Sequence, residues 1–392
     1  MSKKLLVVCP FSCYPPTHGG KLDIYNSLLQ LRDAHLDICV DLLYCDYIQP
    51  ERFLDDYLQK EVGVNEVYFL KIQKNKLLSL LYLFHYKPNY CMLYRCLVKF
   101  KPKQRYDYVL IHGFHADSIL ENPNLDKSRF LYRMHNYEYI YSMQKVPFEK
   151  NFLMKLLRVY DTLKIKFREK WLLNKVKKVL CISSEEYNYF SKLYGEKIYF
   201  LPTYIDTNKF INYERQNNSK NVVLFIGNLF TSYNKEALLW YLKNVHNHIG
   251  NFIPNYRLII AGSTGGADVR WLEAVVGNDK KITTHFDVVD MAPFYKQAKV
   301  FVNPMLNGAG VKLKTLDAIV NGMPVVSTTT GISGTGLSHQ VHCLIANSAD
   351  EFSNAIALLL QNANMAKLLV QNGQNYLKDK FCNQVILNMI YD

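Results

Sequence analysis

The chain lacks the cysteine pattern of a metal-binding or disulfide-bonded protein. Its nine cysteines include no Cys-x-x-Cys pair, and the spacings of Cys9 to Cys13 and of Cys91 to Cys96 are not those of a zinc site. Scattered cysteines of this kind are typical of small buried side chains in a reducing compartment. We therefore expect a cytoplasmic protein with no metal site.

Long apolar runs are absent as well. The longest, such as Leu77–Phe84, are far too short to cross a bilayer. The apolar stretch near the N-terminus has only about four residues and lacks the small-residue cleavage site of a signal peptide. We interpret this stretch as a first buried strand.

Acidic residues are scarce in two segments. Lys71–Arg105 contains nine Lys or Arg and no acid, and Lys150–Lys178 contains ten against Asp161 and Glu169. Such segments attract nucleic acid, anionic lipid or a lipid-linked diphosphate, although a solvated basic helix face would look the same. Because the chain has no recognisable nucleic-acid motif, we expect an anionic membrane surface as the partner and no nucleic acid.

What is present is an alternation of short apolar segments with segments of helical periodicity. One series runs from a strand at Leu5–Cys9 to a strand at Lys178–Ile182, and a second from Asn221–Ile226 to Pro324–Thr328. Between them, Ile211–Lys220 is typical of an interdomain linker or loop. The alternation predicts an α/β fold with two doubly wound parallel sheets facing a central cleft. Ligands bind outside the carboxyl ends of such strands.

The most informative stretch, 304–327, combines a glycine turn, two lysines and a carboxylate at the start of a predicted helix: Gly308, Gly310, Lys312, Lys314 and Asp317. Glycine lets a backbone approach a ligand, and a helix N-terminus offers N–H groups and a positive dipole to an anion. The lysines add charge for phosphate, and Asp317 can accept hydrogen bonds from ribose hydroxyls. Solvated lysines are the plainer alternative, but cations here oppose the dipole. The set therefore favours a nucleotide diphosphate site.

Histidines also follow predicted strands. We expect His135, in His-Asn-Tyr-Glu after Phe130–Met134, to hydrogen-bond the reacting region of a substrate rather than a metal. Glu138 would orient this loop or cap the next helix. His112 and His115 follow another strand, where a structural role is at least as plausible.

Glycines mark three more strand ends. Gly19 and Gly20 precede a predicted helix and could approach a phosphate or an acceptor, although such pairs are more often turns. Gly227 and Asn228 follow the first strand of the second series. The segment Gly262–Gly266 favours a turn over a dinucleotide site, because no acidic residue follows at the right place.

With these residues in view, the chain resembles the retaining glycosyltransferases of the GT-B fold, family 4, of the bacterial surface-polysaccharide type. The stretch 310–322 with Pro324-Val-Val-Ser-Thr is similar to their donor-binding signature. Further similar segments extend over nearly the whole chain: Pro15–Gly20, His135–Glu138, Cys181–Glu186, Leu201–Asp206, Phe225–Asn228 and Phe286–Asp290.

The resemblance implies an acceptor-binding Rossmann-like domain at 1–205, joined by the C-terminal helix at about 376–392, and a donor-binding one at 206–375. It implies transfer from a nucleotide-diphosphate-sugar, a substrate rather than a cofactor, to a glycan or lipid-linked acceptor, with no obligatory metal. By this resemblance, His135 and Lys312 would act in catalysis, and Lys312 and Lys314 would contact the diphosphate. Asp317 would contact the ribose, and Val288 and Val289 the base. Further donor-side contacts would come from Gly19, Gly20, Gly227, Asn228, Gly308 and Gly310.

Two positions depart from the family pattern. Ala309 stands where the family has the first acid of its Glu-x7-Glu pair, and Asn228 stands where it has an arginine. Two alternatives stay open at this point. A nucleotide-sugar 2-epimerase of the same fold would need more carboxylates in the cleft. A non-catalytic basic binding protein would leave the donor pattern unexplained.

Overall fold

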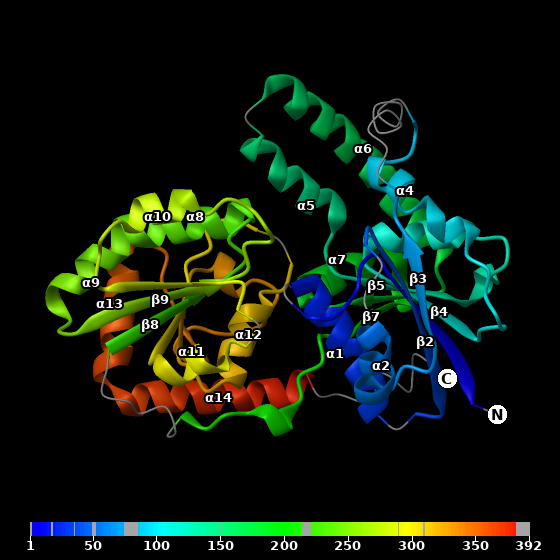
Figure 1. Ribbon diagram of the computed structural model, residues 1–392. Coiled ribbons are helices and arrows are strands. Elements are labelled where there is room, and N and C mark those ends of the chain that lie inside the picture. Colours follow the sequence, from blue (N-terminus) through cyan, green and yellow to red (C-terminus); the bar gives the residue numbers. More distant parts are fainter. Residues whose placement is uncertain are drawn as a thin grey trace. The chain divides into compact units, whose positions relative to one another are not determined.

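The computed structural model describes residues 2–16, 19–34, 36–48, 52–73, 85–149, 151–213, 221–288, 290–308 and 310–381. The chain forms two compact units (Figure 1), the first ending at Tyr204 and the second beginning at Ile205. No helix in the described ranges is both long and apolar enough to span a bilayer.

The first unit contains a seven-stranded parallel sheet in the order β3-β2-β1-β4-β5-β6-β7. Its first strand along the chain lies inside the sheet and reads Leu5-Leu6-Val7-Val8, and all four side chains are buried, as expected for a parallel strand that is covered on both faces. The strands are β1 (Lys3–Cys9), β2 (Ile38–Asp46), β3 (Val67–Lys71), β4 (Tyr108–His112), β5 (Phe130–Met134), β6 (Lys178–Cys181) and β7 (Ile198–Phe200).

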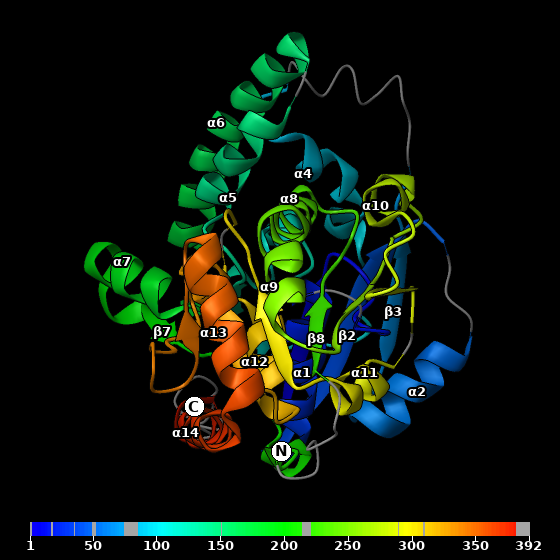
Figure 2. The same ribbon diagram turned by 90° about the vertical axis from the view of Figure 1, so that its left-hand side faces the viewer.

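Helices cover both faces of this sheet. Residues of α1 and α2 pack on one face, whereas residues of α4, α6 and α7 pack on the other. Figures 1 and 2 show α5 and α6 as a hairpin that extends away from the sheet. The helices are α1 (Gly19–Asp33), α2 (Arg52–Val62), α4 (Asn89–Leu93), α5 (Glu138–Lys145), α6 (Phe152–Lys175) and α7 (Ser184–Tyr194).

The second unit contains a six-stranded parallel sheet in the order β10-β9-β8-β11-β12-β13. Figure 1 shows α8 and α10 on one face of it and α11 and α12 on the other. The strands are β8 (Asn221–Ile226), β9 (Tyr256–Gly262), β10 (Ile282–Phe286), β11 (Val300–Asn303), β12 (Val325–Ser327) and β13 (Leu344–Ile345). The helices are α8 (Ser232–Tyr241), α9 (Asn247–Phe252), α10 (Arg270–Val276), α11 (Ala292–Gln297), α12 (Leu313–Val320), α13 (Ala349–Gln361) and α14 (Ala363–Phe381).

The observed unit boundary differs in detail from the sequence-based expectation. Ile211 already belongs to the second unit, where its amide donates to Val320, so the expected linker does not begin there. Residues 214–220 lie outside the described ranges. Helix α14 continues through 376 to Phe381 within the second unit, instead of changing unit at 376, and 382–392 lie outside the described ranges. Ser348 caps α13 with a full capping box, in which Glu351 is the reciprocal partner.

Each sheet has a point where its strand order reverses. In the first unit, successive strands spread from β1 toward β2 on one side and toward β4 on the other. In the second unit, β8 is followed by β9 on one side, and β11 lies on its other side. Loops that leave such a switch point in opposite directions open a crevice at the carboxyl ends of the strands. Both groups of predicted site residues lie at these ends.

Candidate functional site

The second unit brings most of the predicted donor residues together at the β8/β11 switch point. Gly227 and Asn228 directly follow β8, whereas Gly308, Gly310 and Lys312 lie between β11 and α12. The turn after β8 passes close to β9, since a Cβ at Gly262 would lie 1.8 Å from the Gly227 carbonyl oxygen. Only glycine at 262 allows this approach.

Asn234 of α8 packs against the turn after β8 and hydrogen-bonds to it. Its amide carbon lies 3.1 Å from where a Cβ of Gly227 would stand, and its Nδ2 donates to the Asn228 carbonyl at 3.1 Å. Its Oδ1 accepts from Lys314 at 2.9 Å. One amide side chain therefore connects the β8 turn with the first turn of α12.

Lys314 is half-buried, and its ammonium is paired with neutral groups. Besides its bond to Asn234, the Lys314 Nζ lies 5.0 Å from the centroid of the Phe225 ring. In the described part of the chain, Lys314 forms no ion pair with a carboxylate. Burial and the neighbouring charge of Lys312 lower the pKa of Lys314 to about 7. A bound anion would remove much of this cost.

Lys312 ties the glycine turn to the start of α12. It is the N-cap residue and is 5% exposed, and its Nζ donates to the carbonyls of Gly308 at 3.2 Å and Gly310 at 2.7 Å. Gly308 has φ 132° and Gly310 has φ 73°, both in the left-handed region that favours glycine. No side-chain cap occupies the N-terminus of α12, where the amides of Leu313 and Thr315 donate to the carbonyls of Val311 and Lys312.

Asp317 has a partner from α11. Its Oδ2 accepts from the Tyr295 hydroxyl at 2.7 Å, and burial raises its pKa despite this bond. A ribose hydroxyl would therefore share or replace the hydrogen bond from Tyr295. Val288 follows β10 and is half-buried, whereas Val289 lies outside the described residues.

Ala309, the position of the missing acid, also lies outside the described residues. Near it, the Asn307 Nδ2 donates to both oxygens of Glu236 on α8, at 3.0 and 3.2 Å. The loop that contains Asn307 thus has a carboxylate beside it, but this carboxylate is that of Glu236 on helix α8 and not one of the loop itself. On the other side of β8, the segment after Gly262 is a turn, as predicted, because Asp287 accepts hydrogen bonds from Ser263 and Thr264.

In the first unit, the corresponding strand ends carry a closed polar cluster. Arg133 of β5 is fully buried and donates to both oxygens of Asp23 on α1, at 2.6 and 2.8 Å. His135 Nε2 lies 3.2 Å from Asp23 Oδ2 and 3.3 Å from His112 Nδ1. Burial would raise the pKa of Asp23, but Arg133 and His135 hold it well below its usual value.

These contacts fix the orientation of the His135 ring. Asp23 is an ionised acceptor, and burial together with the charges of His135 and Arg133 lowers the pKa of His112 well below its usual value. An N–H at His135 Nε2 faces Asp23, and Nδ1 lies beside Gly113. A Cβ at Gly113 would lie 3.2 Å from this nitrogen.

The same cluster has the donor atoms for a metal, since single ligand atoms of Asp23, His112 and His135 lie within 4.8 Å of one another. However, Arg133 already occupies both oxygens of Asp23. A guanidinium in this place repels a cation. The cluster therefore fits an internal ion pair with an oriented histidine better than it fits a metal site.

Of the other predicted residues of the first unit, some lie close to Asp23 in the sequence and others make structural contacts. Gly19 and Gly20 begin α1, one turn before Asp23. Glu138 lies in the first turn of α5 and does not cap it by a side-chain bond. Instead, its amide donates to the buried carboxylate of Glu169. His115 packs edge-on against Tyr90.

Sequence reasoning missed three residues that hold these groups: Asp23, Arg133 and Asn234. A charged residue inside the apolar strand Phe-Leu-Tyr-Arg-Met is a signal that could have found Arg133, because a fully buried charge requires a partner. Asp23 lies on a helix face otherwise occupied by Ile24, Leu28 and Leu31, which is a weaker signal. Nothing in the local sequence marks Asn234.

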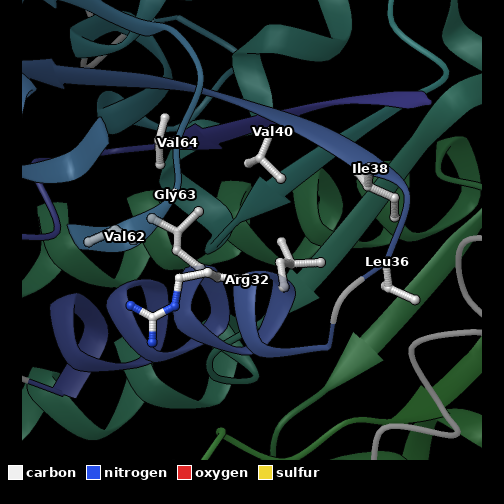
Figure 3. A pocket seen from close by; sticks show the side chains of 9 residues that line it. Arg32, Leu36, Ile38, Val40, Val62, Gly63 and Val64 are labelled. Atoms are coloured by element: carbon white, nitrogen blue, oxygen red, sulfur yellow. The ribbon is translucent and has the colours of Figure 1, made fainter. Parts of the chain in front are cut away.

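A separate cavity of about 300 Å³ lies at the opposite edge of the first sheet. Figure 3 shows it between α1 and the start of β2, where Leu36, Ile38 and Val40 face Arg32. Its lining is mostly apolar, and Arg32 is bonded to Asp33 and the Glu61 carbonyl. It holds none of the polar residues predicted from sequence.

Comparisons with known proteins agree with this architecture. Residues 220–362 match the family model "Glycosyl transferases group 1". A Klebsiella pneumoniae protein described as "Uncharacterized 44.6 kDa protein in cps region" is 30% identical, over 99% of this chain and 99% of its own.

Two solved structures show the same fold. Sucrose-phosphate synthase from Thermosynechococcus elongatus has a TM-score of 0.69 at 14% identity, with 99% of this chain and 98% of that one covered. Anabaena HepE in complex with UDP-glucose has a TM-score of 0.66 at 13% identity, with 99% and 98% covered. The match to the group 1 glycosyltransferase model, not these structures, favours a transferase over the epimerase and the non-catalytic alternatives. The chain is a glycosyltransferase with the GT-B fold, and it belongs to the same family as the Klebsiella cps-region protein.

Proposed function

We propose that the protein is a family 4 retaining glycosyltransferase of surface-polysaccharide synthesis. It would move a sugar from a nucleotide-diphosphate-sugar to a lipid-linked glycan, as in capsule or lipopolysaccharide assembly. Support for the pathway comes from the Klebsiella relative in a cps region, and support for the donor from the UDP-glucose bound to HepE. The cytoplasm would supply the donor.

The observation that carries the proposal is the lysine pair at the β8/β11 switch point. Lys314 holds its charge against an amide and an aromatic ring, and Lys312 stands at the uncapped start of α12. A diphosphate would supply the negative charge that this environment lacks. It would also accept hydrogen bonds from the first amides of the helix.

The same groups would act in the chemical step. When the bond from sugar to diphosphate breaks, negative charge develops on the leaving diphosphate, and donors fixed beforehand stabilise that charge. Lys312, Lys314 and the helix amides are such donors, so we propose that no metal is required. Asp317 would accept from the ribose. His135 Nδ1 would accept a hydrogen bond from a hydroxyl of the transferred sugar.

The donor can be identified by a thermal-shift screen of UDP, GDP, CMP and ADP sugars. One nucleotide series should raise the melting temperature, and products from a library of lipid-linked acceptors can then be identified by mass spectrometry. EDTA should leave turnover unchanged. If no nucleotide sugar stabilises the protein, the proposed donor site is wrong.

The variant Lys312→Ala tests the role of the lysine pair in turnover. We expect turnover to fall by orders of magnitude, because both a phosphate ligand and the support of the glycine turn are lost. The melting temperature should change little. Kinetics like those of the wild type would refute the assignment.

A further inference from the structure

Helix α6 presents an apolar stripe to solvent. Leu153, Leu156, Tyr160, Leu163 and Phe167 follow one another at spacings of three and four residues, which places them on one side of the helix. All five are exposed, Leu153 by 63% and Phe167 by 72%. The stripe runs over fifteen residues, from Leu153 to Phe167, and its ends lie about 21 Å apart along the helix axis.

The N-terminal end of α6 widens this apolar surface. Phe152 is 75% exposed, and Met154 is exposed beside it. Figures 1 and 2 show that this end of α6 lies at the tip of the hairpin, away from the sheet of the first unit. The opposite side of the helix is ordinary core, where Ile165, Leu172 and Leu173 are buried.

Basic side chains border the stripe. Lys155, Lys166 and Lys170 are exposed on α6, whereas the acid Glu169 is buried and accepts the amides of Glu138 and Tyr139. The other acid of the helix, Asp161, accepts the amide of Asn89. An apolar face with lysines along one side is the pattern of a helix that lies in the interface of a bilayer with anionic lipids.

We propose that the stripe on α6 and the tip of the α5–α6 hairpin dock the enzyme onto an anionic lipid bilayer. Apolar side chains would enter the boundary between headgroups and acyl chains, and the bordering lysines would contact lipid phosphates. Docking at this surface would bring the first unit to lipid-linked acceptors. The proposal extends the proposed function but does not depend on the transfer reaction.

Two features favour a bilayer over other occupants. A second copy of this chain would place the same lysines against their counterparts, and like charges oppose that pairing. The described part of the other basic segment exposes Tyr86 but no run of apolar side chains like that of α6. The α6 surface therefore combines apolar area and positive charge in one place.

Vesicle flotation tests the proposal. We expect the full chain to float with vesicles of phosphatidylcholine and phosphatidylglycerol and not with phosphatidylcholine alone. Raising the salt from 0.1 to 0.5 M should reduce this binding severalfold. The double variant Leu156→Gln/Leu163→Gln should bind at least fivefold less. A matched control is Leu358→Gln/Leu368→Gln, which replaces two exposed leucines on α13 and α14 of the second unit.

The charge contribution is tested in the same assay. Lys155→Gln/Lys170→Gln should weaken binding to anionic vesicles severalfold, whereas Lys243→Gln/Lys378→Gln, also exposed, should not. Wild-type flotation of the α6 leucine variant would overturn the proposal. The proposal would also be overturned if the wild type self-associates but does not bind vesicles, and if the α6 leucine variant no longer self-associates. The stripe would then be an interface between two copies of the chain. Nucleotide-induced thermal shifts should be the same in all four variants, so a failure of docking is distinct from a failure of the donor site.

Discussion

In the first unit, the buried guanidinium of Arg133 meets the carboxylate of Asp23, and the pair orients His135. In the second unit, the ammonium of Lys314 meets an amide oxygen and an aromatic ring. Arg133 lies near the carboxyl end of β5, and Lys314 lies in the first turn of α12, the helix after β11. The first charge is balanced by the protein itself, whereas the second is left for a ligand to balance. A closed ion pair contributes to stability and orientation, and an incompletely balanced charge is suited to binding an anion.

The largest expected effect is on the free energy of unfolding and concerns the ion pair of Arg133 with Asp23. Arg133→Met leaves Asp23 buried without its partner, so the free energy of unfolding should fall by about 3–5 kcal/mol, as measured by urea denaturation. The surface pair of Arg270 with Asp268 provides the control, and Arg270→Met should change stability little. If Arg133→Met is as stable as the wild type, the protein does not depend on Arg133 to balance the charge of Asp23, and the contrast between the two units fails.

The site around Lys314 in the second unit should respond in the opposite sense. Lys314→Met removes a half-buried charge whose partners are neutral, so the free energy of unfolding should not fall. Affinity for the donor nucleotide should fall about 10- to 100-fold, or about 1.4–2.8 kcal/mol. Isothermal titration calorimetry measures the affinity. The exposed residue Lys243 serves as the control, since Lys243→Met should bind as the wild type does. Lower stability with unchanged affinity would mean that Lys314 belongs to the fold.

The smallest effect is expected at His135. Loss of one hydrogen bond to the transferred sugar should lower turnover about fivefold, in line with about 1 kcal/mol for such a bond. Asn places an amide near the Nδ1 position and Gln near the Nε2 position. Turnover should therefore fall less in His135→Asn than in His135→Gln, with nucleotide affinity unchanged in both. The reverse order would assign the contact to Nε2.

The fold could be predicted because its determinants are local. Continuous apolar segments such as Leu5–Cys9 and Val300–Asn303 mark buried parallel strands, and their alternation with helices implies doubly wound sheets. The resemblance places the boundary between the units at 205/206, and the structure divides between Tyr204 and Ile205. Composition alone points instead to the polar segment Ile211–Lys220, because a short connection between domains needs no special composition.

The candidate sites could be predicted only in part. Gly308, Gly310 and Lys312 stand out because a glycine turn before a helix has few other uses, and the structure does place them together. Their roles stay predictions, as does that of Asp317. Asn234 and Asp23 could not be assigned, because their importance arises from contacts with residues 80 and 110 positions away.

The proton balance of nucleotide binding tests the central claim most directly. Burial and Lys312 hold the pKa of free Lys314 at about 7, and a bound diphosphate would raise it. Above pH 7 the wild type should therefore take up protons on binding UDP, or whichever nucleotide the screen selects, and its affinity should fall as the pH rises to 9. Calorimetry at pH 8 in two buffers of different ionisation enthalpy measures this uptake. The account predicts uptake in the wild type and its loss in Lys314→Met, and equal proton balance in both proteins would contradict it.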